Sequence, residues 1–113
     1  MQKRFIDCEI DHGIARLYFC RPPVNALSAA FRTQLYDTLK ALIEDDAIQG
    51  IICLTRELPF SAGADIKEFS KGMQGRGFMD LYAVISQSKK PIVCGIRHYA
   101  LGGGLEFAML CHY

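Results

Sequence analysis

The sequence predicts an α/β fold built around a mostly parallel sheet. Strand-like apolar runs alternate with helix-like segments in the order ββαβαβα, and such alternation is typical of parallel sheets with helical crossovers. Residues 50–55 form a continuous apolar run, as expected for a strand covered on both faces of a parallel sheet. Two short turns of small residues, 61–64 and 100–104, each follow an apolar run and lead into a helix-like segment.

A β-hairpin is predicted at the N-terminus. Ile6, Cys8 and Ile10 alternate with acidic residues, which is the pattern of a half-buried strand. Residues 14–19 form its expected partner across an Asp-His-Gly turn. The prolines that follow Arg21 then end the ladder, because proline has no N–H group to donate.

A long helix is predicted after the hairpin. Ser28 is its expected N-cap, and Glu44 lies near its expected end. The apolar residues that recur at helical spacing, and so form its predicted buried face, are Phe31, Leu35, Leu39 and Leu42.

The second half of the chain predicts three shorter helices and one more strand. A short helix is expected at about 65–69, followed at 70–77 by a mobile loop that contains three glycines. The next helix, 78–87, ends before Pro91, which begins a strand at 92–96. The predicted apolar face of that helix consists of Phe78, Leu81, Tyr82 and Ile85. The last helix begins within the second small-residue turn.

Length and composition indicate one small globular domain. The chain has 113 residues, of which 50% are hydrophobic and 22% charged, and its net charge is +1. No basic block supports nucleic-acid binding, and no apolar run approaches the ~20 residues of a membrane-spanning helix.

The cysteines indicate a reducing compartment and no metal site. There are five, an odd number, with no CxxC pair and no secretory signal before them. Cys8, Cys53 and Cys94 lie in apolar or alternating runs, where a thiol is usually buried. His98 and His112 are far apart and lack a third ligand, so we expect no metal.

The two small-residue turns carry the chemical information. Small residues between a strand and a helix allow backbone N–H groups to approach a ligand closely. Two such turns can aim two N–H groups at one oxygen atom, which is the arrangement of an oxyanion hole. Either turn by itself is better explained as an ordinary tight turn. A nucleotide site is not indicated, because no Gly-Lys-Ser/Thr follows the glycines and Phe107 stands where a dinucleotide fingerprint needs a small residue.

Glu106 lies three residues after Gly103, so the two share one face of the predicted last helix. A carboxylate beside an N–H group suits chemistry next to a carbonyl. The N–H group stabilises charge on the oxygen while the carboxylate handles a water molecule or a carbon-bound proton. From spacing alone, the simpler interpretation is that Glu106 complements the helix dipole in the first turn.

The residues around these turns resemble a known family. FSAGADIKEF (60–69) and ALGGGLEFAMLCHY (100–113) are similar to the two signature turns of the enoyl-CoA hydratase/isomerase (crotonase) family, and RPPVNALS (21–28) resembles its first loop. The last four residues look most like the hydratase/isomerase half of the multifunctional fatty-acid β-oxidation proteins. The resemblance runs from about Ile6 to Tyr113 and implies the N-terminal part of a crotonase-like spiral of ββα units.

The resemblance also implies a set of site residues. Ala62 and Gly103 match the two positions whose N–H groups hold a thioester oxygen. Glu106 matches the catalytic glutamate of the second signature turn. Gly63 and Ala64 are expected to line the acyl-CoA pocket beside them.

Asp65 has a structural interpretation that comes first. Asp65 and Glu68 have the spacing of a capping box, in which Asp65 caps the short helix and Glu68 reaches back to it. Asp65 is expected to bound the acyl-CoA pocket only as a second role. The chain departs from the family's pattern at His98, where glycine is common, and in the loop 56–59.

The resemblance implies addition of water to a trans-2-enoyl-CoA in fatty-acid β-oxidation, with no cofactor, because the CoA thioester is the substrate. It also implies a second catalytic glutamate beyond Tyr113. Residues 1–113 are therefore expected to form an incomplete hydratase domain that is inactive alone. Two alternatives remain open: 3-enoyl/2-enoyl-CoA isomerisation, and a non-catalytic CoA-binding or interaction fragment. We expect a homo-oligomer or part of a larger multifunctional chain, cytoplasmic if bacterial and peroxisomal or mitochondrial if eukaryotic.

Overall fold

The elements of the chain follow the predicted order. A computed structural model describes residues 3–65, 67–68 and 75–113. The elements are β1 (Ile6–Asp11), β2 (Ile14–Phe19), α1 (Ala29–Glu44), β3 (Gly50–Leu54), α2 (Phe78–Ser86), β4 (Ile92–Cys94) and α3 (Gly103–Leu110). None of the described helices is long and apolar enough to cross a membrane.

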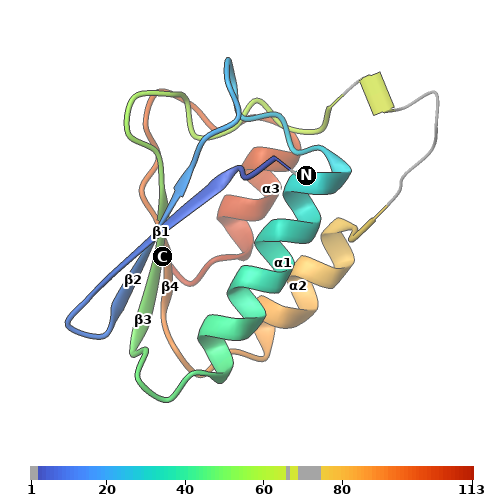
Figure 1. The fold of residues 1–113 in the computed structure, drawn as a ribbon. Coiled ribbons are helices and arrows are strands. Elements are labelled where there is room, and N and C mark those ends of the chain that lie inside the picture. Colours follow the sequence, from blue (N-terminus) through green and yellow to red (C-terminus); the bar gives the residue numbers. More distant parts are fainter. Residues whose placement is uncertain (1–2, 66, 69–74) are drawn as a thin grey trace.

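The strands form one sheet in the order β1-β2-β3-β4. β1 and β2 pair antiparallel, whereas β2–β3 and β3–β4 pair parallel, so the predicted α/β fold with a mostly parallel sheet is confirmed. The three helices lie together on one side of this sheet (Figure 1). For that reason, the prediction that 50–55 is covered on both faces is wrong for the described residues: Ile51 and Cys53 are buried, but Ile52 and Leu54 are only partly covered.

The hairpin forms as predicted, but its outer strand is more exposed than expected. Ala15, Leu17 and Phe19 of β2 point into the core. In β1 only Ile6 is buried, while Cys8 is exposed and Ile10 is 56% exposed. The predicted half-buried pattern is therefore wrong for Cys8 and Ile10, because β1 is the edge strand and only its start lies against the core.

The long helix matches its prediction closely. Ser28 is the N-cap of α1, and its hydroxyl accepts a hydrogen bond of 3.2 Å from the Phe31 N–H group. The apolar residues predicted to be buried, together with Arg32, form the buried face. At the other end, the Lys90 ammonium group donates to the carbonyl of Leu42 at 2.9 Å, which satisfies one of the last free carbonyls of the helix.

The second half differs from its prediction in three places. β4 ends at Cys94 instead of residue 96, because the chain then leaves the sheet and the Arg97 carbonyl accepts from the Phe60 N–H group at 3.0 Å. In α2, Leu81 and Ile85 are buried, but Tyr82 is 51% exposed. Residues 67–68 form a short 3₁₀ turn within the predicted helix 65–69, whereas residues 66 and 69, and 70–74 of the predicted loop, lie outside the described residues.

Four aromatic rings in the core connect the elements that carry the two small-residue turns. The Phe19 ring lies 5.2 Å from Phe31, 5.4 Å from Phe60 and 6.0 Å from Phe107. Phe60 and Phe107 are stacked at 6.3 Å. Phe60 immediately precedes the first turn and Phe107 follows Glu106, so this cluster fixes the positions of both turns relative to the sheet.

Candidate active site

The two turns, about forty residues apart in sequence, lie against each other. Ser61 and Ala100 form a parallel bridge, in which the Leu101 N–H group donates to the Ser61 carbonyl at 3.0 Å. A Cβ atom on Gly104 would lie only 2.5 Å from the Ser61 Cβ atom. The first turn of α3 therefore packs directly on the first signature turn, with no room for a side chain between them.

Two further glycines lie at close contacts in this region. Gly63 has a φ of +108°, and a Cβ there would lie 2.9 Å from the Leu101 carbonyl oxygen and 3.1 Å from the Gly103 nitrogen. A Cβ on Gly103 would lie 2.6 Å from the Phe78 ring of α2. The close approach of Gly63 to Gly103 brings together the two backbone segments that the sequence predicted to share a site.

The hydrogen bonds distinguish among the N–H groups of the first turn. The Ala62 N–H group donates to the Val24 carbonyl at 2.9 Å, and the Gly63 N–H group donates to the Ser61 hydroxyl at 3.0 Å. Among the described residues, the Ala64 and Gly103 N–H groups have no protein acceptor. An N–H group that already donates to a carbonyl is not available for a substrate oxygen. The prediction of Ala62 as an oxyanion donor therefore disagrees with this hydrogen bonding, and Ala64 is the donor that the first turn leaves available.

Glu106 lies on the first turn of α3, one helical turn after Gly103. Its N–H group bonds the Gly102 carbonyl at 2.9 Å, and its side chain is exposed. Together with residues of α2 and α3 it lines a groove of about 290 Å³. The other lining residues are Phe78, Met79, Tyr82, Met109 and Leu110. The carboxylate thus borders an apolar groove on the same helix that presents the Gly103 N–H group.

Asp65 and Glu68 hold the first turn in place, but not as the predicted capping box. One Asp65 oxygen accepts from the Lys67 N–H group at 3.0 Å, and the other pairs with Arg21 at 2.9 Å. The Glu68 carboxylate does not reach back to Asp65; it accepts from the Ala29 N–H group at 2.9 and 3.0 Å. The reciprocal box is therefore wrong, because Glu68 instead satisfies a free N–H group at the start of α1.

The charge of Asp65 is stabilised by these partners. Burial alone raises its pKa, but the hydrogen bonds from Lys67 and Arg21 and the positive charges of both residues outweigh that effect and hold the pKa below its ordinary value. The carboxylate faces Arg21, so the structure ties Asp65 to the network around α1. Its predicted second role, bounding the acyl-CoA pocket, stays a prediction.

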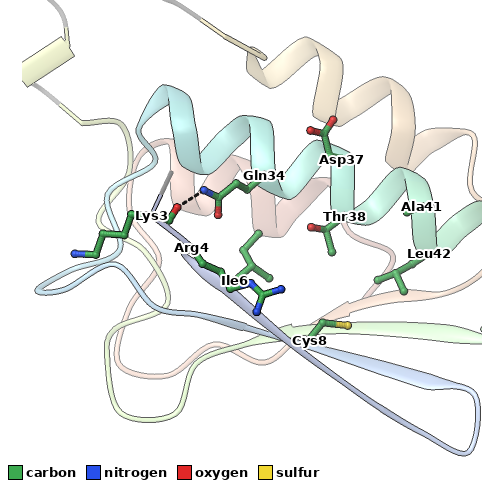
Figure 2. Close-up of a pocket in the computed structure, with 9 residues that line it drawn as sticks. All are labelled: Lys3, Arg4, Ile6, Cys8, Gln34, Asp37, Thr38, Ala41 and Leu42. Carbon is green, nitrogen blue, oxygen red and sulfur yellow. Dashed lines mark hydrogen bonds between the residues drawn. The ribbon is translucent and has the colours of Figure 1, made fainter. Parts of the chain in front are cut away.

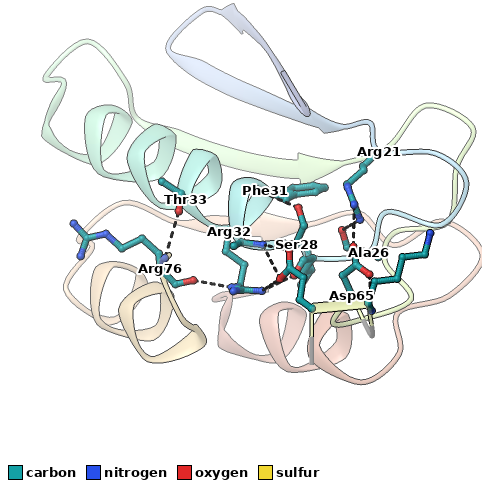
Figure 3. A network of polar contacts seen from close by, with 12 residues as sticks. Arg21, Ala26, Ser28, Phe31, Arg32, Thr33, Asp65 and Arg76 are labelled. Carbon is teal, nitrogen blue, oxygen red and sulfur yellow. Dashed lines mark hydrogen bonds and ion pairs between the residues drawn. The ribbon is translucent and has the colours of Figure 1, made fainter. Parts of the chain in front are cut away.

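The buried charged residue of this network is Arg32, which the sequence did not single out. Figure 3 shows its guanidinium group lying beside the start of α1, between the Arg76 backbone and the Ser28 region. It donates to the Leu27 and Arg76 carbonyls, each at 2.7 Å, and lies 3.5 Å from a Glu68 oxygen. Arg32 follows the predicted core residue Phe31, and no sequence pattern marks it as different from an exposed helical arginine.

Asn25 is a second residue that sequence reasoning missed. It is fully buried with a φ of +53°, its side chain accepts from the Arg21 N–H group at 2.6 Å, and it donates to the Pro59 carbonyl at 2.9 Å. Asparagine tolerates this left-handed backbone better than most residues. The position of Asn25 shortly after two prolines was the available sequence signal. The Asn25 side chain joins the loop after β2 to the segment that leads into the first turn.

Other features of the described residues add no catalytic groups. A crevice of about 530 Å³ lies between β1 and α1, where Cys8, Gln34 and Thr38 are among the lining residues (Figure 2). It contains none of the predicted site residues. In the part of the chain that the structure describes, no three His, Cys, Asp or Glu side chains are grouped so as to hold a metal ion.

Comparison with solved structures identifies the class of fold. The enoyl-CoA hydratase/isomerase from Pseudoalteromonas atlantica T6c superposes with a TM-score of 0.84 at 25% identity, over 96% of this chain and 45% of that one. Human mitochondrial delta3-delta2-enoyl-CoA isomerase superposes with a TM-score of 0.78 at 31% identity, over 97% of this chain and 46% of that one. The fold is thus the crotonase fold, of which the described residues form a part.

The family model of enoyl-CoA hydratase/isomerase matches residues 9–113, and the chain belongs to this family. The peroxisomal bifunctional enzyme of Danio rerio is 35% identical over 104 residues, which are 92% of this chain and 14% of that protein. A probable enoyl-CoA hydratase of Bacillus subtilis is 39% identical over an alignment of 114 positions, gaps included, that covers 95% of this chain and 44% of that protein. The chain therefore spans less than half the length of these relatives.

Proposed function

We propose that this chain supplies the thioester-binding part of an enoyl-CoA hydratase-type active site that acts in fatty-acid β-oxidation. The observation that supports this proposal is the close pairing of the two signature turns, in which the Ala64 and Gly103 N–H groups have no acceptor among the residues that the structure describes. Family membership and the names of the relatives, which include hydratases of bacteria and peroxisomal bifunctional enzymes, point to the same substrate class.

In the proposed reaction, the two N–H groups hold the thioester oxygen of a trans-2-enoyl-CoA. Water adds its oxygen to C3, electron density moves from the double bond toward the thioester oxygen, and a proton then returns to C2. Hydrogen-bond donors placed where this negative charge develops lower the barrier. Glu106, one helical turn from Gly103, is the proposed general acid–base group for the water molecule or the proton.

Isomerisation between 3-enoyl-CoA and 2-enoyl-CoA is the second candidate. It needs a proton moved from one carbon to another, which a single carboxylate can perform. Glu106 is the one carboxylate among the described residues that line the α2–α3 groove. The similarity to the human delta3-delta2-enoyl-CoA isomerase, at 31% identity, favours keeping this reaction in the test.

A hybrid enzyme tests both reactions. In it, this chain replaces the matching segment of the Bacillus subtilis relative, which supplies the remaining length. With crotonyl-CoA, we expect loss of the conjugated enoyl-thioester absorbance and formation of 3-hydroxyacyl-CoA. With 3-enoyl-CoA, isomerised product would favour the second candidate, and its complete absence would remove it. A folded hybrid that turns over no enoyl-CoA of any chain length contradicts the proposal.

The residues of the proposed site are tested in the same hybrid. Glu106→Gln keeps the size of the side chain and removes its charge, so turnover is expected to fall about 10² to 10⁴-fold while acyl-CoA binding changes little. Glu44→Gln, at the exposed end of α1, is the matched control and should leave turnover unchanged. Unchanged turnover in Glu106→Gln would return Glu106 to its simpler role at the helix start.

Association and compartment are further parts of the proposal. We propose that the whole protein is a homo-oligomer or one part of a multifunctional chain, as the match to the bifunctional enzymes suggests. The named relatives fit a bacterial cytoplasm, a peroxisome or a mitochondrion equally well. Size-exclusion chromatography of the hybrid and of the native protein tests the first point, and localisation in the source cell tests the second.

A further inference from the structure

Three thiols lie on β3, on β4 and at the C-terminal end of α3, and the proposed reaction uses none of them. Cys53 on β3 and Cys94 on β4 occupy paired positions of adjacent strands. Cys111 is the C-cap residue of α3. The Sγ atoms of Cys94 and Cys111 are only 3.1 Å apart, although the two residues are separated by 17 positions in sequence. Both residues are partly exposed, whereas Cys53 is completely buried.

The backbone holds Cys94 and Cys111 in this position. After α3, the last residues of the chain lie beside β4. The His112 N–H group donates to the Ile92 carbonyl at 2.9 Å, and the Cys94 N–H group donates to the Tyr113 carbonyl at 2.8 Å. The Ile92 N–H group also donates to the imidazole Nδ1 of His112 at 2.9 Å. The backbone segments that carry the two thiols are therefore held next to each other by hydrogen bonds on both sides.

We propose that Cys94 and Cys111 form a reversible disulfide when the protein meets hydrogen peroxide. One thiol loses its proton and attacks a peroxide oxygen, which gives a sulfenic acid and releases water. The second thiol then attacks that sulfur, and a second water leaves as the S–S bond forms. In total two thiols lose two protons and two electrons, and the O–O bond is reduced. Closing the sulfur–sulfur distance from 3.1 Å to a covalent bond of about 2.05 Å needs a movement of roughly 1 Å.

The surroundings of the pair favour the protonated thiols, so we expect its oxidation to be slow. For Cys94, the hydrogen bond with Cys111 lowers the pKa, but the hydrogen bond with Cys53 and burial outweigh it. For Cys111, the hydrogen bond with Cys94 and burial both raise the pKa. Both pKa values lie well above the ordinary thiol value, so few thiolates exist at neutral pH. The adjacent position of the second thiol then favours disulfide formation over further oxidation of the first.

The disulfide would link the C-terminal end of α3, the helix that follows the second signature turn, covalently to β4. The segment between Cys94 and Cys111 contains Gly103 and Glu106, and the bond would fix the end of α3 to β4. A cross-link across a loop of this length restricts the unfolded chain. This inference concerns the thiols alone and does not rest on the proposed function.

Peptide mapping tests the pairing. The chain is treated with hydrogen peroxide, its remaining thiols are alkylated after unfolding, and the digest is analysed by mass spectrometry. We expect a loss of mass equal to two hydrogen atoms and a cross-linked peptide pair joining Cys94 to Cys111, both reversed by dithiothreitol. The variant Cys8→Ser/Cys20→Ser removes the exposed thiols and prevents links between chains. Since the unsubstituted chain gives the same map, the result does not depend on that variant folding.

Thermal unfolding gives a second measurement. The oxidised chain should unfold at a midpoint roughly 5 °C or more above the reduced chain. Cys111→Ser should show neither the mass change nor the shift, and Cys53→Ala should keep both. Any of three results would overturn the inference. The first is a disulfide between Cys53 and Cys94, and the second is sulfinic acid at Cys94 or Cys111 in place of the link. The third is no mass loss at a peroxide concentration that oxidises the exposed Cys8.

Discussion

Gly63→Ala tests whether the two signature turns pack as closely as the structure shows. Gly63 has a φ of +108°, and holding a residue with a side chain in such a conformation costs about 1–3 kcal/mol. The new Cβ atom would also lie 2.9 Å from the Leu101 carbonyl oxygen and 3.1 Å from the Gly103 nitrogen. Both are backbone atoms and cannot rotate away, so overpacking costs about 1–3 kcal/mol more. The expected loss of unfolding free energy is therefore about 2–6 kcal/mol, a large fraction of the roughly 5–15 kcal/mol of a typical domain.

The measurement is urea unfolding followed by circular dichroism, with Gly77→Ala as the matched control. Gly77 has an ordinary φ of −92° at the start of α2, and among the described residues other than its chain neighbours no heavy atom lies within 4 Å of the position where its Cβ would be. The control should cost less than about 1 kcal/mol, the usual difference between glycine and alanine at an N-cap. If Gly63→Ala were no less stable than Gly77→Ala, the close contact between Gly63 and Gly103 would not exist, and the argument for a shared site would fail with it.

Three other outcomes follow from the same contacts. Phe107→Ala removes a ring that is 1% exposed and stacked on Phe60, so urea unfolding should show a loss of about 3–5 kcal/mol; a loss below about 1 kcal/mol would mean that the cluster does not hold the turns. Asp65→Asn should destabilise the chain at neutral pH. The pKa of Asp65 in the folded chain lies below its ordinary value of 3.8. The difference in unfolding free energy between the unsubstituted chain and Asp65→Asn should therefore be fully present above pH 3.8 and should disappear as the pH falls through the folded pKa. A difference that stays constant at lower pH would contradict the ion pair between Asp65 and Arg21. The 113-residue chain alone should show negligible hydration of crotonyl-CoA, and robust turnover that Glu106→Gln abolishes would refute this expectation.

The local parts of the structure were predictable from sequence. The hydroxyl of Ser28 and the apolar residues from Phe31 to Leu42 act within a few positions of one another, so spacing alone locates the helix and its buried face. The order of strands and helices follows from the same kind of short-range pattern. The exposure of Ile10 was not predictable, because it depends on β1 lying at the edge of the sheet.

The polar contacts between distant segments could not be predicted in the same way. Glu68 satisfies the Ala29 N–H group from 39 positions away, and the spacing Asp65 to Glu68 favoured a local capping box instead. The choice between the two candidate oxyanion donors in the first turn also depends on a contact between distant segments. Whether Ala62 or Ala64 has an available N–H group depends on the Val24 carbonyl, which lies in a loop that the sequence identified only by its prolines.

The exposure of Glu106 sets what this part of the fold can do by itself. The turns that present the Ala64 and Gly103 N–H groups are fixed by backbone packing and by the buried rings of Phe60 and Phe107. In contrast, the Glu106 carboxylate and the groove it borders are open to water. Hydrogen-bond donors and carboxylates act more strongly on a developing charge when water is excluded. If the proposed function is correct, we therefore expect these residues to hold the thioester oxygen, and we expect turnover only when the groove between α2 and α3 is covered.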